Sequence, residues 1–319
     1  MRHPYTKTTM GMVLCCWGVV GDAEPNNYAN LTKGAALLEK RDLSGAEAAF
    51  SAAIRVDGKD PRAYYQRGVC YEKQKKIPLA MADYRQAIQL NPEFAEANNN
   101  LGALLLEQGK SKEAVGYLRE AVRHRHTYGE AWYNMGLALF EQGEFQKAAK
   151  AFESASRLKP NDADVRVNLG ATLQRLGDLE GAERQLKEAV RLSPKDAMVC
   201  QSYGKLLAKN GNHAEAAKQF QRAVVLGVRS AQLHCDLGRA YRKLGNLDQS
   251  IAEYHLALKI DSKHYQALLL LGLAHAASGK CDVAKQTLAR YVARNKGADP
   301  KIIEKVIKRC VWKKGKGGI

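Results

Sequence analysis

The chain has 319 residues, of which 45% are hydrophobic and 26% charged, a balance typical of a folded protein and not of a disordered one. Its formal net charge is +17, and no apolar run reaches the ~18 residues that a membrane-spanning helix needs. Seven cysteines are scattered without a Cys-x-x-Cys pair, so neither a zinc site nor a disulfide framework is indicated.

The first 26 residues differ in composition from the rest of the chain. Arg2 and Lys7 precede an apolar run at residues 10–20, and the small residues at 21–23 resemble a cleavage site. This is the layout of a secretory signal peptide and predicts export, to the periplasm or out of the cell. Because the run is short, the alternative is a short apolar helix packed on the next segment of a cytoplasmic protein.

From residue 27 to residue 298 the sequence repeats with a period of 34 residues. In each copy an alanine, once replaced by serine, comes twelve residues after a glycine. A Phe, Tyr or Leu comes sixteen residues after the same glycine. The glycines are Gly34, Gly68, Gly102, Gly136, Gly170, Gly204, Gly238 and Gly272. The eight copies, whose positions we number from 1 to 34, span 27–60, 61–94, 95–128, 129–162, 163–196, 197–230, 231–264 and 265–298.

Each copy predicts two helices joined by a turn. Positions 4, 7, 8 and 11 share one helical face, which in copy 4 carries Trp132, Met135, Gly136 and Leu139. Small residues at positions 8 and 20 let the two helices approach closely, and a glycine at position 15 suits the left-handed conformation that ends a helix. Asn98 occupies position 4 of copy 3, so we expect its replacement by Leu or Trp to stabilise the array.

The register resembles the tetratricopeptide repeat (TPR) family, whose pattern is W-x2-L-G-x2-Y followed by Ala, an aromatic residue and Pro. Copy 4, "WYNMGLALFEQGEFQKAAKAFESASRLKP", matches this pattern most closely, with Trp132, Gly136, Ala148, Phe152, Ala155 and Pro160. The resemblance implies an all-α fold, a right-handed α-solenoid (a TPR superhelix) of eight helix-turn-helix repeats. It also implies a scaffold for protein–protein interaction that binds an extended peptide or a partner protein in a concave groove.

The segment "DPKIIEKVIKRCVWKK" follows repeat 8. Asp299 and Pro300 are suitable first residues of a helix, and apolar residues between 302 and 311 form one stripe with lysines opposite. Because terminal repeats need a polar outer cover, we predict a capping helix at 299–314 and a disordered basic tail at 315–319.

Few residues indicate chemistry. His124 and His126 are expected in a solvated loop, since no further ligand lies near them, and Cys200 and Cys235 are expected to be buried apolar residues. The chain has no glycine-rich phosphate loop, no serine-centred elbow and no distinctive carboxylate pair. We therefore expect no enzymatic activity, no cofactor, no bound metal and no small-molecule substrate.

The predicted groove is lined by first-helix positions 2, 5, 6, 9, 12 and 13. Position 6 carries a polar series, Gln66, Asn100, Asn134, Asn168, Ser202 and Asp236. An amide both donates and accepts hydrogen bonds, and in related arrays such an asparagine ladder grips an extended chain. The alternative is that asparagine is simply common at this position. Asn99 and Tyr133, at position 5, complete the predicted contacts of repeats 3 and 4.

Charges on the same face are segregated along the chain. Repeats 3 and 4 contribute Glu96, Glu107, Glu130 and Glu141, whereas repeats 6 and 7 contribute Lys205, Lys209, Arg239, Arg242 and Lys243. This predicts an acidic middle and a basic C-terminal half, which would steer a partner with an acidic segment towards repeats 6 and 7. No three consecutive repeats carry the residue set of the carboxylate clamp that binds chaperone C-termini.

Two other functions remain as alternatives. The net charge favours nucleic-acid binding, but the groove lacks a continuous basic stripe interleaved with aromatic residues, so we do not expect it. The second alternative is self-assembly into a homo-oligomer through an exposed face of repeat 1.

Overall fold

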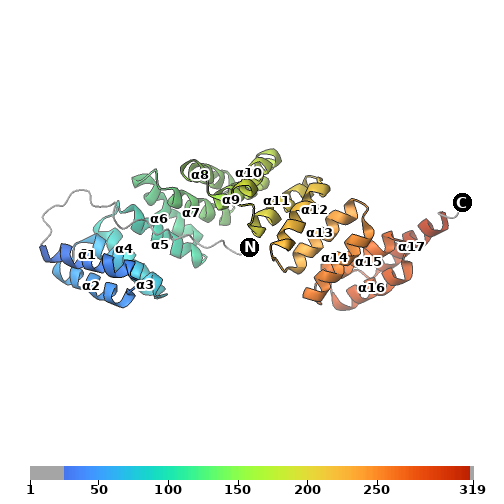
Figure 1. The fold of residues 1–319 in the computed structure, drawn as a ribbon, viewed down its shortest axis with the longest axis horizontal. Helices are drawn as coiled ribbons and strands as arrows, with labels where there is room; N and C mark the ends of the chain where they lie inside the picture. The colour runs from blue at the N-terminus through green and yellow to red at the C-terminus, as the bar shows by residue number, and fades with distance from the viewer. Residues whose placement is uncertain (1–24, 317–319) are drawn as a thin grey trace. The chain divides into compact units, whose positions relative to one another are not determined.

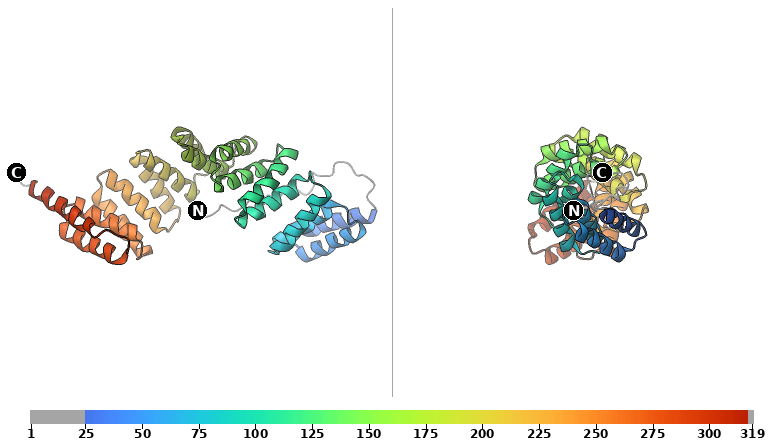
Figure 2. Two further views of the ribbon diagram at one scale, coloured as in Figure 1. Left: turned by 180° about the vertical axis from the view of Figure 1, so that it is seen from behind. Right: turned by 90° about the vertical axis from the view of Figure 1, so that its left-hand side faces the viewer.

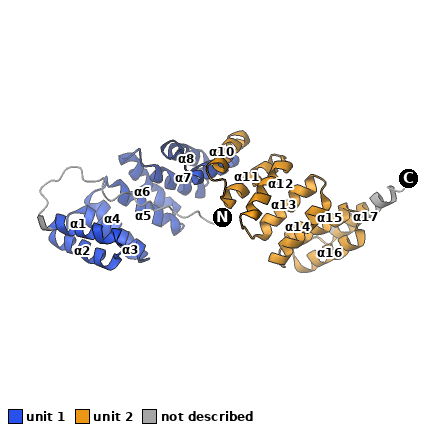
Figure 3. Cartoon of the chain, in the orientation of Figure 1, with its two compact units in different colours: residues 1–176 blue, residues 177–319 orange. Residues whose placement is uncertain are grey.

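The computed structural model describes residues 25–316 and forms 17 α-helices and no strand from them (Figure 1). The chain divides into two compact units, residues 1–176 and 177–319 (Figure 3). The predicted signal peptide and the last three residues lie outside the described residues. None of the helices formed by residues 25–316 combines the length and the apolar character that a bilayer crossing requires.

The first unit consists of consecutive helices that lie side by side (Figure 2). Its first eight helices form one pair for each of repeats 1 to 4, and α9 is the first helix of repeat 5. The helices are α1 (Pro25–Glu39), α2 (Leu43–Val56), α3 (Pro61–Lys73), α4 (Ile77–Leu90), α5 (Ala95–Glu107), α6 (Ser111–His124), α7 (Gly129–Glu141), α8 (Phe145–Leu158) and α9 (Ala163–Leu176).

The second unit begins with the second helix of repeat 5 and continues with one pair for each of repeats 6 to 8. Its helices are α10 (Leu179–Leu192), α11 (Ala197–Lys209), α12 (His213–Val225), α13 (Ala231–Lys243), α14 (Leu247–Ile260), α15 (Tyr265–Ala277), α16 (Cys281–Arg294) and α17 (Lys301–Lys316). The predicted all-α fold of paired helices is thus confirmed in both units.

The two helices of a pair touch where a glycine at position 8 meets the bulky residue at position 24. In repeat 4 a Cβ atom added to Gly136 would lie 2.6 Å from the ring of Phe152, which is fully buried. The same clash would arise between Gly102 and Leu118 in repeat 3, also at 2.6 Å. Because no side chain fits in this space, the glycine sets the distance between the two helices.

The turn between the helices of a pair contains one residue in the left-handed conformation. Position 15 is glycine with positive φ in repeats 3 to 8, for example Gly143 at +77° and Gly211 at +83°. Repeats 1 and 2 place Arg41 and Lys75 there, at φ 61° and 63°. The geometry of the turn is therefore common to all the repeats, and glycine is its favoured residue because it has no Cβ atom.

A second recurring contact joins neighbouring repeats at the carbonyl of position 32 and is present at five of the junctions between repeats. Asn98 Nδ2 donates to Pro92 O at 3.0 Å, and the indole nitrogen of Trp132 donates to His126 O at 2.8 Å. Further donors to this carbonyl are Arg166 to Pro160 at 3.0 Å, Arg222 to Pro194 at 2.9 Å and Arg294 to Ser262 at 3.1 Å. The end of the second helix is thus satisfied by a side chain of the following repeat.

This contact overturns the expectation that Asn98 is a weak point of the packed face. Its side chain is 1% exposed and also donates to Phe94 O at 3.1 Å. The amide of Asn98 therefore donates the same hydrogen bond as the indole of Trp132. Helical spacing alone does not reveal this bond, because its acceptor belongs to the turn that precedes the helix.

The predicted capping helix is confirmed as α17, which packs against α15 and α16. A disulfide joins Cys281, at the start of α16, to Cys310 on α17, with Cα atoms 5.8 Å apart. The scattered cysteine spacing did not indicate this bond, because the two cysteines are 29 residues apart and meet only through helix packing. The helix also extends through Gly315 to Lys316, two residues into the expected tail, since one glycine costs a helix only about 1 kcal/mol.

Replacing Gly136 with Ala tests the contact within a pair. The new methyl group overlaps the ring of Phe152, so we expect the free energy of unfolding to fall by about 1–3 kcal/mol. Gly116 is the matched control because it lies in α6 with nothing within 4 Å of an added Cβ. Gly116→Ala should stabilise by about 0.5–1 kcal/mol in the same urea titration. Equal effects at both sites would show that the contact with Phe152 does not set the distance between the two helices.

Replacing Asn98 with Leu tests the contact between repeats. Leu has no donor for Pro92 O, so we expect a loss of about 1–3 kcal/mol despite the larger apolar side chain. Asn98→Trp is the companion variant, because Trp132 supplies this bond in repeat 4, and it should be more stable than Asn98→Leu. A higher melting temperature for Asn98→Leu than for the parent protein would refute the assignment.

Candidate functional site

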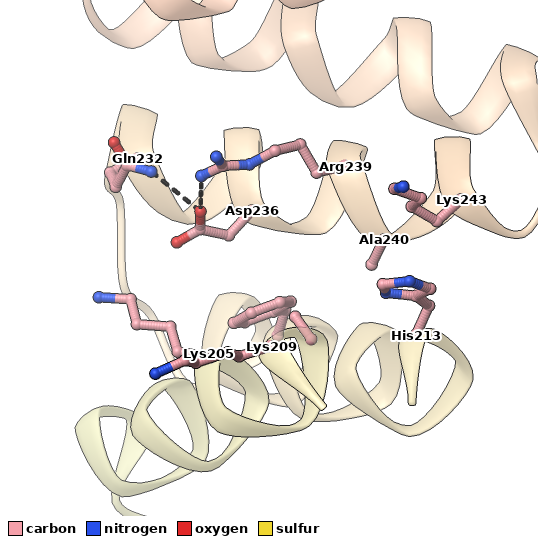
Figure 4. Close-up of a pocket in the computed structure, with 10 residues that line it drawn as sticks. Lys205, Lys209, His213, Gln232, Asp236, Arg239, Ala240 and Lys243 are labelled. Atoms are coloured by element: carbon pink, nitrogen blue, oxygen red, sulfur yellow. Dashed lines mark hydrogen bonds and ion pairs between the residues drawn. The ribbon is translucent and has the colours of Figure 1, made fainter. Parts of the chain in front are cut away.

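A pocket of about 510 Å³ opens in the second unit between α11, α12 and α13 (Figure 4). Lys205 and Lys209 lie one helical turn apart on α11. On α13 the spacing of four, three and four residues places the polar lining residues on one face. These residues are Gln232, Asp236, Arg239 and Lys243, and the pocket is completed by Ala208, His213, Phe220 and Ala240.

Asp236 is the buried centre of the polar stripe on α13. It is 8% exposed, and its Oδ1 atom accepts hydrogen bonds from Gln232 Nε2 at 2.9 Å and from Arg239 Nη2. Its Oδ2 atom is also buried and has no hydrogen-bond partner. Since a buried carboxylate is stable only when its oxygens are paired, the free Oδ2 is an unsatisfied acceptor in the pocket wall.

The lysines give the pocket a positive charge. Lys205, Lys209 and Lys243 are exposed, and none of them forms an ion pair with an acidic side chain in the part of the chain that the structure describes. Arg239, by contrast, is already paired with Asp236. Because lysine is cationic at neutral pH, three uncompensated charges face the pocket.

The predicted basic residues do not all converge. Arg242 does not line the pocket, because it lies about 100° around α13 from Lys243, and its Nε atom is buried without a partner. The sequence prediction also missed His213 and Phe220, which come from the second helix of repeat 6. The left-handed turn at Gly211 brings this helix back beside α11, and only that turn places His213 at the pocket.

Two of the four predicted acidic groove residues, Glu96 and Glu130, have basic partners within the first unit. Glu96 forms an ion pair with Arg125, and Glu130 lies 3.2 Å from Lys159 Nζ, which also contacts Asp162 at 3.0 Å. These basic partners, Arg125 and Lys159, come from the loop after the second helix of the same repeat, which lies outside the first-helix positions predicted to line the groove.

The asparagines of repeats 3 and 4 form a buried hydrogen-bond network. Asn134 Nδ2 donates to Asn99 Oδ1 at 3.0 Å, and Asn99 Nδ2 donates to Asn100 Oδ1 at 3.1 Å. Asn100 Nδ2 reaches Tyr84 Oη of repeat 2 at 3.3 Å. All three asparagines are at most 5% exposed. The network therefore joins three successive repeats.

A tyrosine hydroxyl extends this network at one end, where Tyr84 donates to Glu72 Oε2 at 2.7 Å. A separate pair lies in the next repeats, where Asn168, which is half-buried, donates to Tyr133 Oη at 3.1 Å. Burial raises the pKa of Tyr84 and of Tyr133 above the usual value near 10, so both hydroxyls stay protonated. The predicted peptide contacts of these asparagines remain a prediction, but their amides already serve the fold. Gln66 is half-buried.

The histidines and cysteines form no reactive centre in the described residues. Within residues 25–316 no group of three or more His, Cys, Asp or Glu side chains could hold a metal ion. Cys200 and Cys235 are buried as expected, and burial raises the pKa of Cys235 to about 12, which keeps it a thiol. His124 ends α6 rather than lying in a loop, with Nε2 3.5 Å from Glu120 Oε2.

Comparison with protein families decides the relationship of the chain. The family model described as "Cilia and flagella-associated protein 70 C-terminal domain", a TPR domain, matches residues 72–302. The chain belongs to this TPR family. A second model, described as a tetratricopeptide repeat, matches residues 31–93. No curated protein matches the chain.

Solved structures contain the same TPR fold. YrrB, described as a TPR protein with an unusual peptide-binding site, is 25% identical, with 58% of this chain and 95% of YrrB covered at a TM-score of 0.52. PilF of Pseudomonas aeruginosa is 20% identical, and the match covers 66% of this chain and 97% of PilF at a TM-score of 0.57. Cut9 from the APC/C complex Cut9–Hcn1 is 20% identical, and the match covers 88% of this chain and 55% of the other chain at a TM-score of 0.56. The last two show the fold alone.

Replacing Asn134 with Ala tests the network inside this TPR domain. The change leaves Asn99 Oδ1 buried without its donor, so we expect a loss of about 1–3 kcal/mol in the free energy of unfolding. Ser154→Ala is the control, because the Ser154 hydroxyl bonds only to groups of its own helix, donating to Lys150 O and accepting from Arg157 Nη2 near the surface. Its effect should stay within about 0.5 kcal/mol. If Asn134→Ala is equally mild, the network does not hold the repeats together.

Proposed function

We propose that this TPR domain is a non-enzymatic scaffold that binds an extended peptide or a partner protein, and that an acidic segment of the partner occupies the pocket between α11, α12 and α13. The observation that carries the proposal is the set of three unpaired lysines around this pocket. Complementary charge steers an acidic partner and selects its direction along the repeats.

The comparisons support the general part of this proposal. TPR domains commonly serve as protein-interaction scaffolds, and the likeness to YrrB supports a peptide as the ligand. The contacts of the first unit fit a supporting role, since Glu96 and Glu130 are paired within their own repeats and leave the lysines of the second unit as the uncompensated groups.

Nucleic acid is the less favoured ligand for this pocket. Single-stranded nucleic acid binds to surfaces where aromatic side chains stack on bases between cationic residues. Two rings are among the ten lining residues, all of them described: Phe220, which is 1% exposed, and His213, which is half-buried. One accessible imidazole is a smaller stacking platform than the rows of aromatic side chains on such surfaces.

Charge reversal at the pocket tests the proposal. We expect the double variant Lys205→Glu/Lys243→Glu to weaken binding of fluorescein-labelled hexaglutamate about tenfold or more, because attraction becomes repulsion at two positions. Fluorescence anisotropy measures the dissociation constant, and circular dichroism checks that the helices are intact.

The matched control is Lys187→Glu/Lys285→Glu, which changes the net charge equally at exposed sites on α10 and α16 away from the pocket. It should retain nearly full affinity. Equal weakening by both double variants would mean that the ligand responds to net charge alone, and the proposed site would be wrong.

A further inference from the structure

Asp236 is an unexpected residue in a pocket built to attract anions. Among the ten lining residues, all of them described, it alone is acidic, and it is 8% exposed. Its Oδ1 atom is held by Gln232 and Arg239, whereas its buried Oδ2 atom has no partner. In Figure 4 this second oxygen points towards the side of the pocket where Lys205 and Lys209 lie.

The unpaired oxygen calls for a donor from a ligand. A buried acceptor without a partner is destabilising, and a carboxylate can accept only from an N–H or O–H group. Every non-proline residue of a peptide carries one backbone N–H. The backbone of a DNA strand carries only acceptor oxygens, so it leaves Oδ2 unsatisfied, whereas an RNA backbone carries a 2′-OH donor on each ribose.

The negative charge of Asp236 also favours a peptide over a phosphate chain. It compensates Arg239 and places a negative charge beside any anion that enters the pocket. A phosphate group that approaches Oδ2 meets repulsion and has no proton to offer at neutral pH, whereas a peptide presents a neutral N–H at its backbone and its carboxylates on side chains. Like charges brought together in a partly buried site are strongly unfavourable.

We infer that Asp236 is the specificity-determining residue of this pocket: its Oδ2 atom accepts a backbone N–H of an acidic peptide, while Lys205, Lys209 and Lys243 bind the peptide's carboxylates. This inference rests on the proposed function, since it concerns which anionic chain the same pocket accepts. The lysines attract polyanions in general, and Asp236 selects a peptide from among them.

The test uses the full chain and three labelled probes. They are hexaglutamate, hexaglutamate in which every second amide nitrogen is methylated, and an abasic DNA hexamer, which has neither bases nor 2′-OH groups to donate. For the parent protein we expect methylation to weaken binding about 10- to 100-fold, the usual effect of losing a hydrogen bond to a charged group. The abasic DNA hexamer should bind more weakly than hexaglutamate when both are measured at the same salt concentration.

Asp236→Asn removes the charge and turns the free acceptor into a donor, while its remaining oxygen can still accept from Gln232 and Arg239. In this variant we expect methylated and unmethylated peptides to bind with equal affinity and the abasic DNA hexamer to gain about tenfold relative to the parent protein. Asp248→Asn, at an exposed site on α14 of the same repeat, is the control and should leave all three affinities unchanged.

The outcomes separate this inference from the proposed function. If hexaglutamate does not bind the parent protein, the proposed function fails. If it binds and is lost on charge reversal of the lysines, yet neither methylation nor Asp236→Asn changes the preference, the role of Asp236 is wrong and the proposed function stands. If Asp236→Asn does not fold, equal binding of the two peptides to the parent protein overturns the inference by itself.

Discussion

The close contact between a glycine on the first helix and a ring or leucine on the second is the constraint on which the repeat depends. Gly136 against Phe152 and Gly102 against Leu118 leave no room for a Cβ atom. A single residue with no side chain thus sets the separation of the helices, and the left-handed residue in the turn reverses the chain so that the second helix lies beside the first. Because both conditions recur every 34 residues, equivalent positions occupy equivalent places in each unit. Lys205 and Arg239, and likewise Lys209 and Lys243, are such equivalent positions on neighbouring first helices.

Polar groups hold neighbouring repeats together where apolar packing ends. The carbonyl at position 32 accepts from the next repeat, and the donor changes from Asn98 to Trp132 while the acceptor stays the same. The amides of Asn99, Asn100 and Asn134 form a buried chain across three repeats. Such networks stabilise only when every member is paired, and these side chains are therefore occupied by the fold before any ligand arrives.

The distribution of unpaired charge differs between the two units. In the first unit, acidic groove residues find basic partners within their own repeat, as Glu130 does with Lys159. In the second unit, Lys205, Lys209 and Lys243 have none among the described residues, and Asp236 keeps one oxygen without a donor. An acidic peptide, the ligand we propose, would supply both the negative charge and the N–H group that these side chains lack.

The sequence by itself determined the period, the paired helices, the left-handed glycine turns and the capping helix, because each follows from spacing along one chain segment. Four of the five basic residues that it assigned to the groove line one pocket, and their role as peptide contacts stays a prediction. Only the tertiary structure decided which groups the side chains contact. It placed Arg242 outside the pocket, assigned Asn98 to a main-chain carbonyl, paired Glu96 with Arg125 and joined Cys281 to Cys310. Helical periodicity specifies the direction of a side chain around its own axis, whereas its partner is specified by which neighbouring helix or turn lies within about 3 Å in that direction.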